Sequence, residues 1–72
     1  MPGRFLTLEE VAQELAITKS QVYALVRRGD LPALKIGGRG VWRIERAKLE
    51  EFIERAFEET RRYIAENPFP SS

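Results

Sequence analysis

The sequence predicts a mainly α-helical fold with one small β-hairpin. Two short segments with helical apolar spacing come first, a glycine-rich segment with alternating apolar residues follows, and a long helical segment comes last. The chain has 72 residues, which predicts one domain. We expect this domain at residues 1–66 and a flexible tail at residues 67–72. A domain of this size buries only about 60% of its unfolded surface, so an enclosed active site has no room.

The first helix is predicted at residues 8–15. Thr7 is followed three residues later by Glu10, and this pair forms a capping box, in which each side chain accepts a hydrogen bond from the other residue's backbone N–H. The apolar residues that follow have helical spacing, namely Leu8, Val11, Ala12 and Leu15.

The second helix begins after Thr18, which forms another capping box with Gln21. Gly29 ends it, because glycine readily adopts the left-handed conformation beyond a helix terminus. Two short helices joined by a turn of about three residues form a helix-turn-helix, although an ordinary αα-hairpin has the same pattern.

The outward face of the second helix has the composition of a DNA-binding surface. A merely solvated helix usually mixes both charges, whereas this face has no acidic residue. Its short polar groups, aromatic hydroxyl and long cations are the types that contact phosphates and base edges in a major groove. The candidate residues are Lys19, Ser20, Gln21, Tyr23, Arg27 and Arg28.

Apolar residues alternate on both sides of residues 37–40, which predicts a β-hairpin at about residues 34–44. The alternation predicts that one face of the hairpin points to the core, with Leu34, Ile36, Trp42 and Ile44. It also predicts that Lys35 and Arg43 point away from the core, with Arg39 at the tip.

The glycines of the hairpin raise three possibilities. A phosphate-binding loop is excluded because a strand, rather than a helix N-terminus, follows the turn. The glycines can supply positive φ angles and keep the tip thin, so that Arg39 enters a minor groove, whose negative potential attracts arginine. Alternatively, they only form the turn.

A long helix is predicted at about residues 46–66, and Asn67-Pro68 would end it. Such a helix is about 30 Å long, more than the small body of residues 5–45 can cover. Phe57, Tyr63 and Ile64 continue its apolar stripe beyond that body. We expect these three residues either to fold back onto Phe5 or to pair with a second copy.

Composition excludes several classes of site. The chain has no cysteine and no histidine, which removes disulfides, thiolate or imidazole metal sites and Ser/His nucleophiles. We expect no cofactor and no small-molecule ligand. The first ten residues lack an apolar leader and no long apolar run follows, which predicts a soluble cytoplasmic protein without membrane contact.

Charge is segregated along the chain although its net value is only +1. Residues 18–46 contain seven basic and two acidic side chains, whereas residues 47–72 contain four basic and six acidic ones. Residues 1–17 are also net acidic, with one basic and three acidic side chains. A basic middle segment favours a polyanionic partner.

Four segments together resemble the excisionase-type, MerR-like winged helix-turn-helix family, from about Leu6 to Ile53. They are LTLEEVAQEL, the recognition-helix run TKSQVYALVRRGDLPA, the wing KIGG and the closing WRIERAKLEEF. The resemblance implies double-stranded DNA binding, with the second helix in the major groove and the wing at the minor groove or backbone. Carried over by position, the contacts are the six residues of the second helix named above and Lys35, Arg39 and Arg43.

This chain departs from the family pattern in two places. Gly40-Val41 stands where many relatives have another basic residue, and the effector domain and metal-binding cysteines of MerR regulators are absent. We therefore expect a non-enzymatic DNA-binding protein, either a small transcription regulator or a recombination directionality factor that bends DNA beside an integrase. The alternative is a protein-interaction adapter that docks through the long C-terminal helix.

Overall fold

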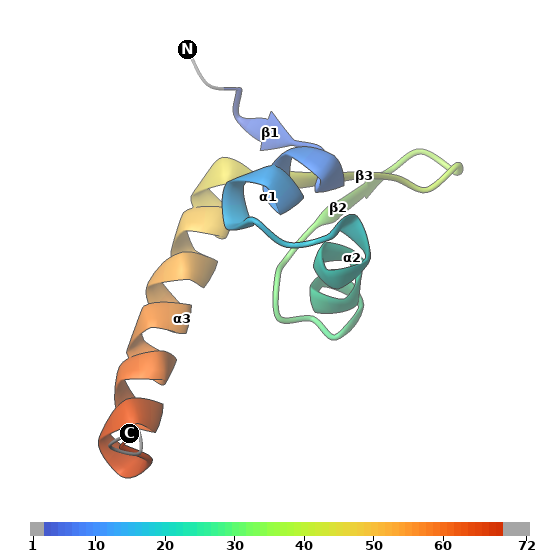
Figure 1. Ribbon diagram of the computed structural model, residues 1–72. Coiled ribbons are helices and arrows are strands. Elements are labelled where there is room, and N and C mark those ends of the chain that lie inside the picture. The colour runs from blue at the N-terminus through green and yellow to red at the C-terminus, as the bar shows by residue number, and fades with distance from the viewer. Residues whose placement is uncertain (1–2, 69–72) are drawn as a thin grey trace.

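In the computed structural model, which describes residues 3–68, three helices pack around a small antiparallel sheet (Figure 1). The elements are β1 (Phe5–Leu6), α1 (Leu8–Leu15), α2 (Lys19–Arg27), β2 (Leu34–Ile36), β3 (Val41–Glu45) and α3 (Arg46–Glu66). The predicted fold class, mainly α with a β-hairpin wing, is confirmed. The molecule is elongated, 49 × 25 × 19 Å, because α3 projects beyond the body.

Both predicted capping boxes are present. The Thr7 hydroxyl accepts a hydrogen bond from the backbone N–H of Glu10 at 3.0 Å, and the Glu10 carboxylate accepts one from the Thr7 N–H at 2.9 Å. Thr18 and Gln21 repeat the arrangement at 3.1 and 2.9 Å. Beyond α2, Gly29 has a φ of 82° and its N–H donates to the Val26 carbonyl. Local sequence therefore sets the start of α1 and both ends of α2.

The core lies where α1, α2, β3 and the start of α3 meet. Its buried side chains are Leu6, Leu8, Val11, Ala12, Val22, Leu31, Ile44 and Leu49. Leu31 is fully buried although it lies in the loop after Gly29, and sequence periodicity gave no sign of it. The turn returns the chain over α2, where the N–H groups of Asp30 and Leu31 both donate to the Leu25 carbonyl.

The sheet has the strand order β1-β3-β2, so β3 is its central strand. β1 was not predicted, because two residues are too short to show an alternation. Leu6 pairs with Ile44, and both side chains are buried against α1. Phe5 pairs with Glu45 and stays exposed on the opposite face.

The hairpin is present, but the predicted orientation of β2 is wrong. Ile36 pairs with Val41 and Lys35 with Trp42, so Lys35 shares the inner face with Trp42. Leu34 and Ile36 lie on the outer face with Arg43, and about half of each apolar side chain is exposed. The cause is the four-residue turn at residues 37–40, which pairs even-numbered residues of β2 with odd-numbered residues of β3.

The start of α3 is tied to the body. The Arg46 N–H donates to the Arg4 carbonyl at 2.7 Å, and the Arg46 guanidinium binds the Glu14 carboxylate of α1 at 3.1 Å. This hydrogen bond raises the pKa of Arg46 above its ordinary value. Leu49 is then buried in the core, so only the first turns of α3 pack against the body.

The distal part of α3 is exposed, so the structure contradicts one of the two alternatives, the fold-back onto Phe5, and pairing with a second copy stays a prediction. Phe57 and Tyr63 are 66% and 62% exposed, and Ile64 is 39% exposed. α3 points away from β1, where Phe5 lies (Figure 1). The Asn67 N–H donates to the Tyr63 carbonyl at the predicted helix end, and residues 69–72 of the expected tail lie outside the described residues.

No helix within residues 3–68 has the length and apolar character needed to cross a membrane.

Candidate nucleic-acid interface

The outward face of α2 presents the predicted row of side chains to solvent. Lys19, Ser20 and Arg27 are exposed, and Tyr23 is 40% exposed. The Arg27 guanidinium lies 5.8 Å from the centroid of the Tyr23 ring, a cation–π distance. These residues are available to a partner because Val22 turns the opposite side of α2 into the core.

Two predicted contact residues of α2 already have intramolecular partners. The Gln21 side-chain oxygen accepts hydrogen bonds from the Thr18 backbone N–H and hydroxyl, which leaves its amide NH₂ group for other contacts. The Arg28 guanidinium donates two hydrogen bonds to the Asp30 carboxylate, at 2.6 and 3.0 Å. Arg28 can contact a phosphate only by sharing or breaking that pair.

The tip of the wing consists of residues 37–40, with Arg39 exposed at its end. Gly37 and Gly40 have φ angles of 70° and 72°, so the turn requires glycine at these two positions. Gly38 has no positive φ, so glycine is not required there for its backbone conformation. Farther from the tip, Arg43 is half-buried, and its guanidinium donates to the carbonyl of neighbouring Trp42 at 2.8 Å.

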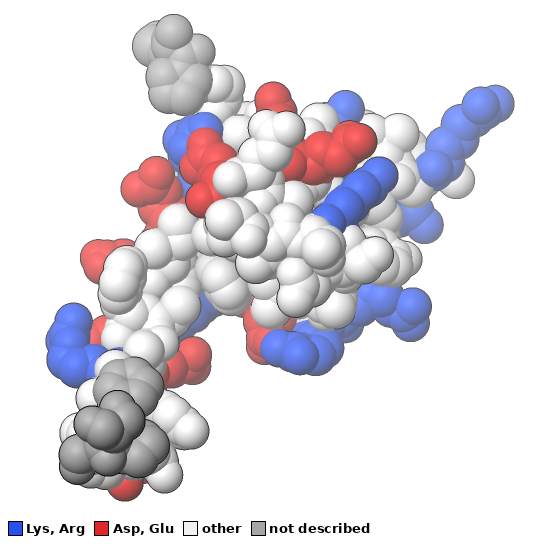
Figure 2. Space-filling model, viewed as in Figure 1, with Lys and Arg blue, Asp and Glu red and all other residues white. Residues whose placement is uncertain are grey.

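Five cations of α2 and the wing have no carboxylate partner within residues 3–68. They are Lys19, Arg27, Lys35, Arg39 and Arg43. By contrast, Arg4, Arg28, Arg46, Lys48 and Arg61 all form ion pairs with acidic side chains, and Arg55 and Arg62 of α3 are the other two cations of residues 3–68 without a carboxylate partner. Figure 2 shows mainly basic side chains around α2 and the wing, acidic ones over α1, and side chains of both signs along α3. The segregation predicted from the sequence is therefore also segregation in space.

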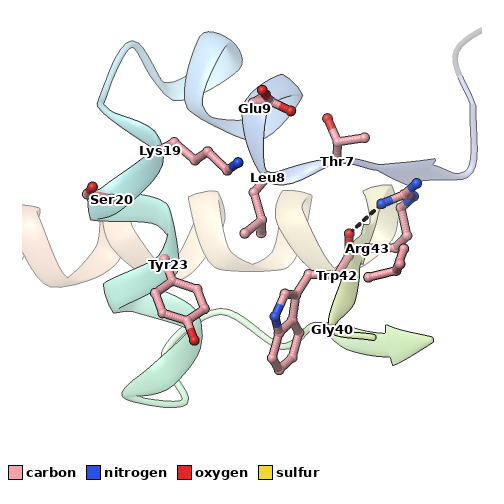
Figure 3. Close-up of a pocket in the computed structure, with 10 residues that line it drawn as sticks. Thr7, Leu8, Glu9, Lys19, Ser20, Tyr23, Gly40, Trp42 and Arg43 are labelled. Carbon is pink, nitrogen blue, oxygen red and sulfur yellow. Dashed lines mark hydrogen bonds between the residues drawn. The ribbon is translucent and has the colours of Figure 1, made fainter. Parts of the chain in front are cut away.

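A cleft of about 630 Å³ separates α2 from β3 (Figure 3). The first turn of α1 forms its third wall. Its lining residues are Thr7, Leu8, Glu9, Lys19, Ser20, Tyr23, Gly40, Val41, Trp42 and Arg43. Three predicted helix residues and one predicted wing residue thus meet in one concave site, whereas Arg27 and Arg39 lie outside its lining.

Trp42 was predicted to be a core residue, and in the structure it also lines the cleft. The indole packs against the core cluster but is only half-buried, and it lines the cleft. Its ring lies 6.3 Å from the Tyr23 ring at an interplanar angle of 72°, an edge-on aromatic contact between the wing and α2. Sequence alternation alone gave no sign of this contact.

The described residues contain no cluster of three or more acidic, cysteine or histidine side chains that could hold a metal ion. A family model described as a helix-turn-helix domain matches residues 5–56, which cover β1 through the middle of α3. No curated protein and no solved structure matches the chain.

Proposed function

Because the chain belongs to this helix-turn-helix family of excisionase-like DNA-binding domains, we propose that it binds double-stranded DNA sequence-specifically. α2 would enter the major groove, and the wing would contact the adjacent minor groove or backbone. The main supporting observation is the set of five unpaired cations on α2 and the wing. Cations without carboxylate partners are free to neutralise phosphates, which supplies most of the affinity for DNA.

We assign the nine candidate residues different roles within this interface. Lys19, Tyr23 and Arg27 form the exposed row on α2 that would contact phosphates and base edges, with Ser20 beside them. Lys35 and Arg39 would bind the wing to the minor groove or the backbone of the DNA. Gln21 and Arg28 would contribute less, because Gln21 is hydrogen-bonded to Thr18 and Arg28 is ion-paired with Asp30, whereas Arg43 keeps an unpaired charge although it donates to the Trp42 carbonyl.

The protein would act as a small transcription regulator or as a recombination directionality factor that bends DNA beside an integrase. Footprinting on the DNA upstream of its own coding sequence separates these roles. A single site over a promoter favours regulation, whereas repeated sites beside a recombination core favour the second role. No enzymatic activity is part of the proposal.

Substitutions of arginine test the interface. Arg27→Ala should weaken binding by about 1–3 kcal/mol if the side chain contacts a base, or flatten the salt dependence by about one unit of slope if it contacts a phosphate. Arg62→Ala, in the distal part of α3, is the matched control and should bind like the parent. Because Arg27 is exposed, thermal melts of both variants should match the parent. Unchanged DNA affinity of a folded Arg27→Ala protein would remove α2 from the interface.

Arg39→Ala tests the wing separately. Its largest loss of affinity should occur at sites flanked by A·T pairs, where the minor groove is narrow and its potential most negative. Equal losses on all flanking sequences would mean that Arg39 contacts only the backbone. No loss on any flank would leave the glycine-rich segment as a simple turn.

One observation favours the second candidate function, an adapter that docks through α3. Phe57, Tyr63 and Ile64 are exposed on a helix whose first turns pack against the body. A DNA-binding protein loses affinity for duplex DNA steeply as salt rises, whereas an adapter would not bind duplex DNA even at low salt. A titration of the parent protein with mixed-sequence duplex at several salt concentrations decides between them.

A further inference from the structure

The indole nitrogen of Trp42 is a hydrogen-bond donor without an acceptor. Within residues 3–68 no group accepts a hydrogen bond from Trp42 Nε1, and the one side-chain hydrogen bond at Trp42 uses its backbone carbonyl, which accepts from the Arg43 guanidinium. The indole is half-buried, and Nε1 is not among the fully enclosed unpaired atoms of the structure. A half-buried tryptophan usually has its apolar body packed and its N–H paired or hydrated.

The indole N–H faces the cleft between α2 and β3. Figure 3 shows the nitrogen on the ring edge nearest Tyr23, whose hydroxyl also has no hydrogen-bond partner among the described residues. Two neutral donors from two different elements therefore line one cavity. Lys35, the cross-strand partner of Trp42, adds a cation on the same face of the hairpin.

The position of the cleft selects the kind of acceptor. It lies between the helix proposed for the major groove and the wing proposed for the neighbouring minor groove. The sugar–phosphate backbone separates two adjacent grooves of a duplex, so a backbone phosphate is the group that would lie at the cleft. An indole N–H can only donate, and phosphate oxygens only accept.

Charges around the cleft restrict where a phosphate can lie. Glu9 lines the α1 side and would repel an anion there, whereas Lys19 lines the α2 side and Arg43 the β3 side. Trp42 and Tyr23 form the part of the wall away from Glu9 (Figure 3). A phosphate is therefore accommodated best between the two aromatic side chains and Lys19.

We propose that Trp42 is a DNA-binding residue whose indole N–H donates a hydrogen bond to one backbone phosphate seated in this cleft beside Tyr23. The proposal rests on the proposed DNA-binding function and adds a residue that sequence reasoning placed in the core alone. The edge-on contact with Tyr23 also joins the wing to α2 beside the cleft.

The direct test uses Trp42→Phe, which keeps an aromatic ring in the cleft wall and removes the N–H. On a duplex that the parent protein selects from a random-sequence pool, its affinity should fall about tenfold, the usual effect of losing a hydrogen bond to a charged group. The salt dependence should keep the parent's slope, because tryptophan carries no charge. Lys19→Ala should flatten that slope instead.

Matched tyrosine variants provide the control for lost donors. Tyr23→Phe removes the hydroxyl inside the cleft and should weaken binding, whereas Tyr63→Phe removes an exposed hydroxyl on α3 and should not. Neutral methylphosphonate placed at one phosphate at a time then locates the contact. At the contacted phosphate, the parent should lose more affinity than Trp42→Phe does, and elsewhere the two should lose equally.

A measurement on the parent protein covers the case in which Trp42→Phe fails to fold. Trp42 is the single tryptophan, so one indole N–H resonance and one tryptophan emission report on it. Both should change as the selected duplex is added. If the parent binds DNA with neither signal changing, or if a folded Trp42→Phe binds as tightly as the parent, the proposed phosphate contact of Trp42 is wrong. The proposed DNA-binding function is then unaffected. If the parent selects no duplex, the proposed function itself fails, and this inference with it.

Discussion

The two strands of the wing have similar sequences and very different environments. β3 lies at the centre of the sheet, buries Ile44 completely and half-buries Trp42, whereas every residue of β2 is exposed. Each strand contains one isoleucine and at least one other apolar residue, so hydrophobicity alone does not separate them. The difference arises from pairing, since β3 contacts β1, β2, α1 and α3 and β2 contacts mainly β3. Alternation therefore shows that a strand has two faces, but not that either face is covered.

Matched isoleucine variants should show the largest difference between the strands. Ile44→Ala removes a fully buried side chain and should cost about 2–5 kcal/mol, enough to unfold much of a domain with a total stability near 5 kcal/mol. Ile36→Ala removes a half-exposed side chain and should change stability by about 0.5 kcal/mol or less. Urea denaturation followed by circular dichroism measures both. Equal losses would mean that the outer face of β2 is covered in solution.

The wrong orientation predicted for β2 shows what the sequence could and could not supply. Both helix starts and the end of α2 were predictable, because Thr7, Thr18 and Gly29 act within three or four residues of themselves. The face of β2 depends on which residue pairs with Val41 across the turn. The alternation does not show how many of the residues between Lys35 and Trp42 form the turn, and the length of the turn fixes the register.

The residue types of the candidate interface were predictable from the sequence, but which of these side chains are free of intramolecular partners was not. Exposed cations on α2 followed from helical periodicity, since Val22 had to face the core. The Arg28–Asp30 pair and the Arg43 hydrogen bond depend on side-chain conformations, which the spacing of residues in the sequence does not show. The cleft between α2 and β3 could not be predicted either, because it requires the relative position of two elements distant in sequence.

Glycine variants in the wing turn should show a smaller effect than Ile44→Ala. Gly40→Ala puts a side chain at a φ of 72° and should cost roughly 1 kcal/mol, even though the added methyl group meets no neighbouring atom. Gly38→Ala, two residues away in the same turn and without a positive φ, is the control and should be within about 0.5 kcal/mol of the parent. Thermal melts at matched concentration measure the difference. If Gly38→Ala is the more damaging variant, the turn in solution differs from the one described.

The smallest effect on stability is expected at the distal part of α3. Like the outer face of β2, it is an exposed apolar surface. Ile64→Glu should change the free energy of unfolding of the dilute protein by no more than about 0.5 kcal/mol, because Ile64 does not contact the core cluster. Its effect should instead be on assembly. We expect the parent to form a weak, concentration-dependent dimer through Phe57, Tyr63 and Ile64, since an apolar stripe on a solvated helix gains most from pairing.

Sedimentation of the parent and Ile64→Glu, with Ile36→Glu as the matched change on β2, separates these surfaces. Loss of association in Ile64→Glu alone places the contact on α3, whereas loss in Ile36→Glu alone places it on the outer face of the wing. A parent that sediments as a monomer at every concentration, alone and on tandem-site DNA, would rule out self-pairing through either surface. The α3 stripe would then need a different partner, as the adapter function requires, and the same Ile64→Glu variant would be the one to lose that partner while still binding DNA.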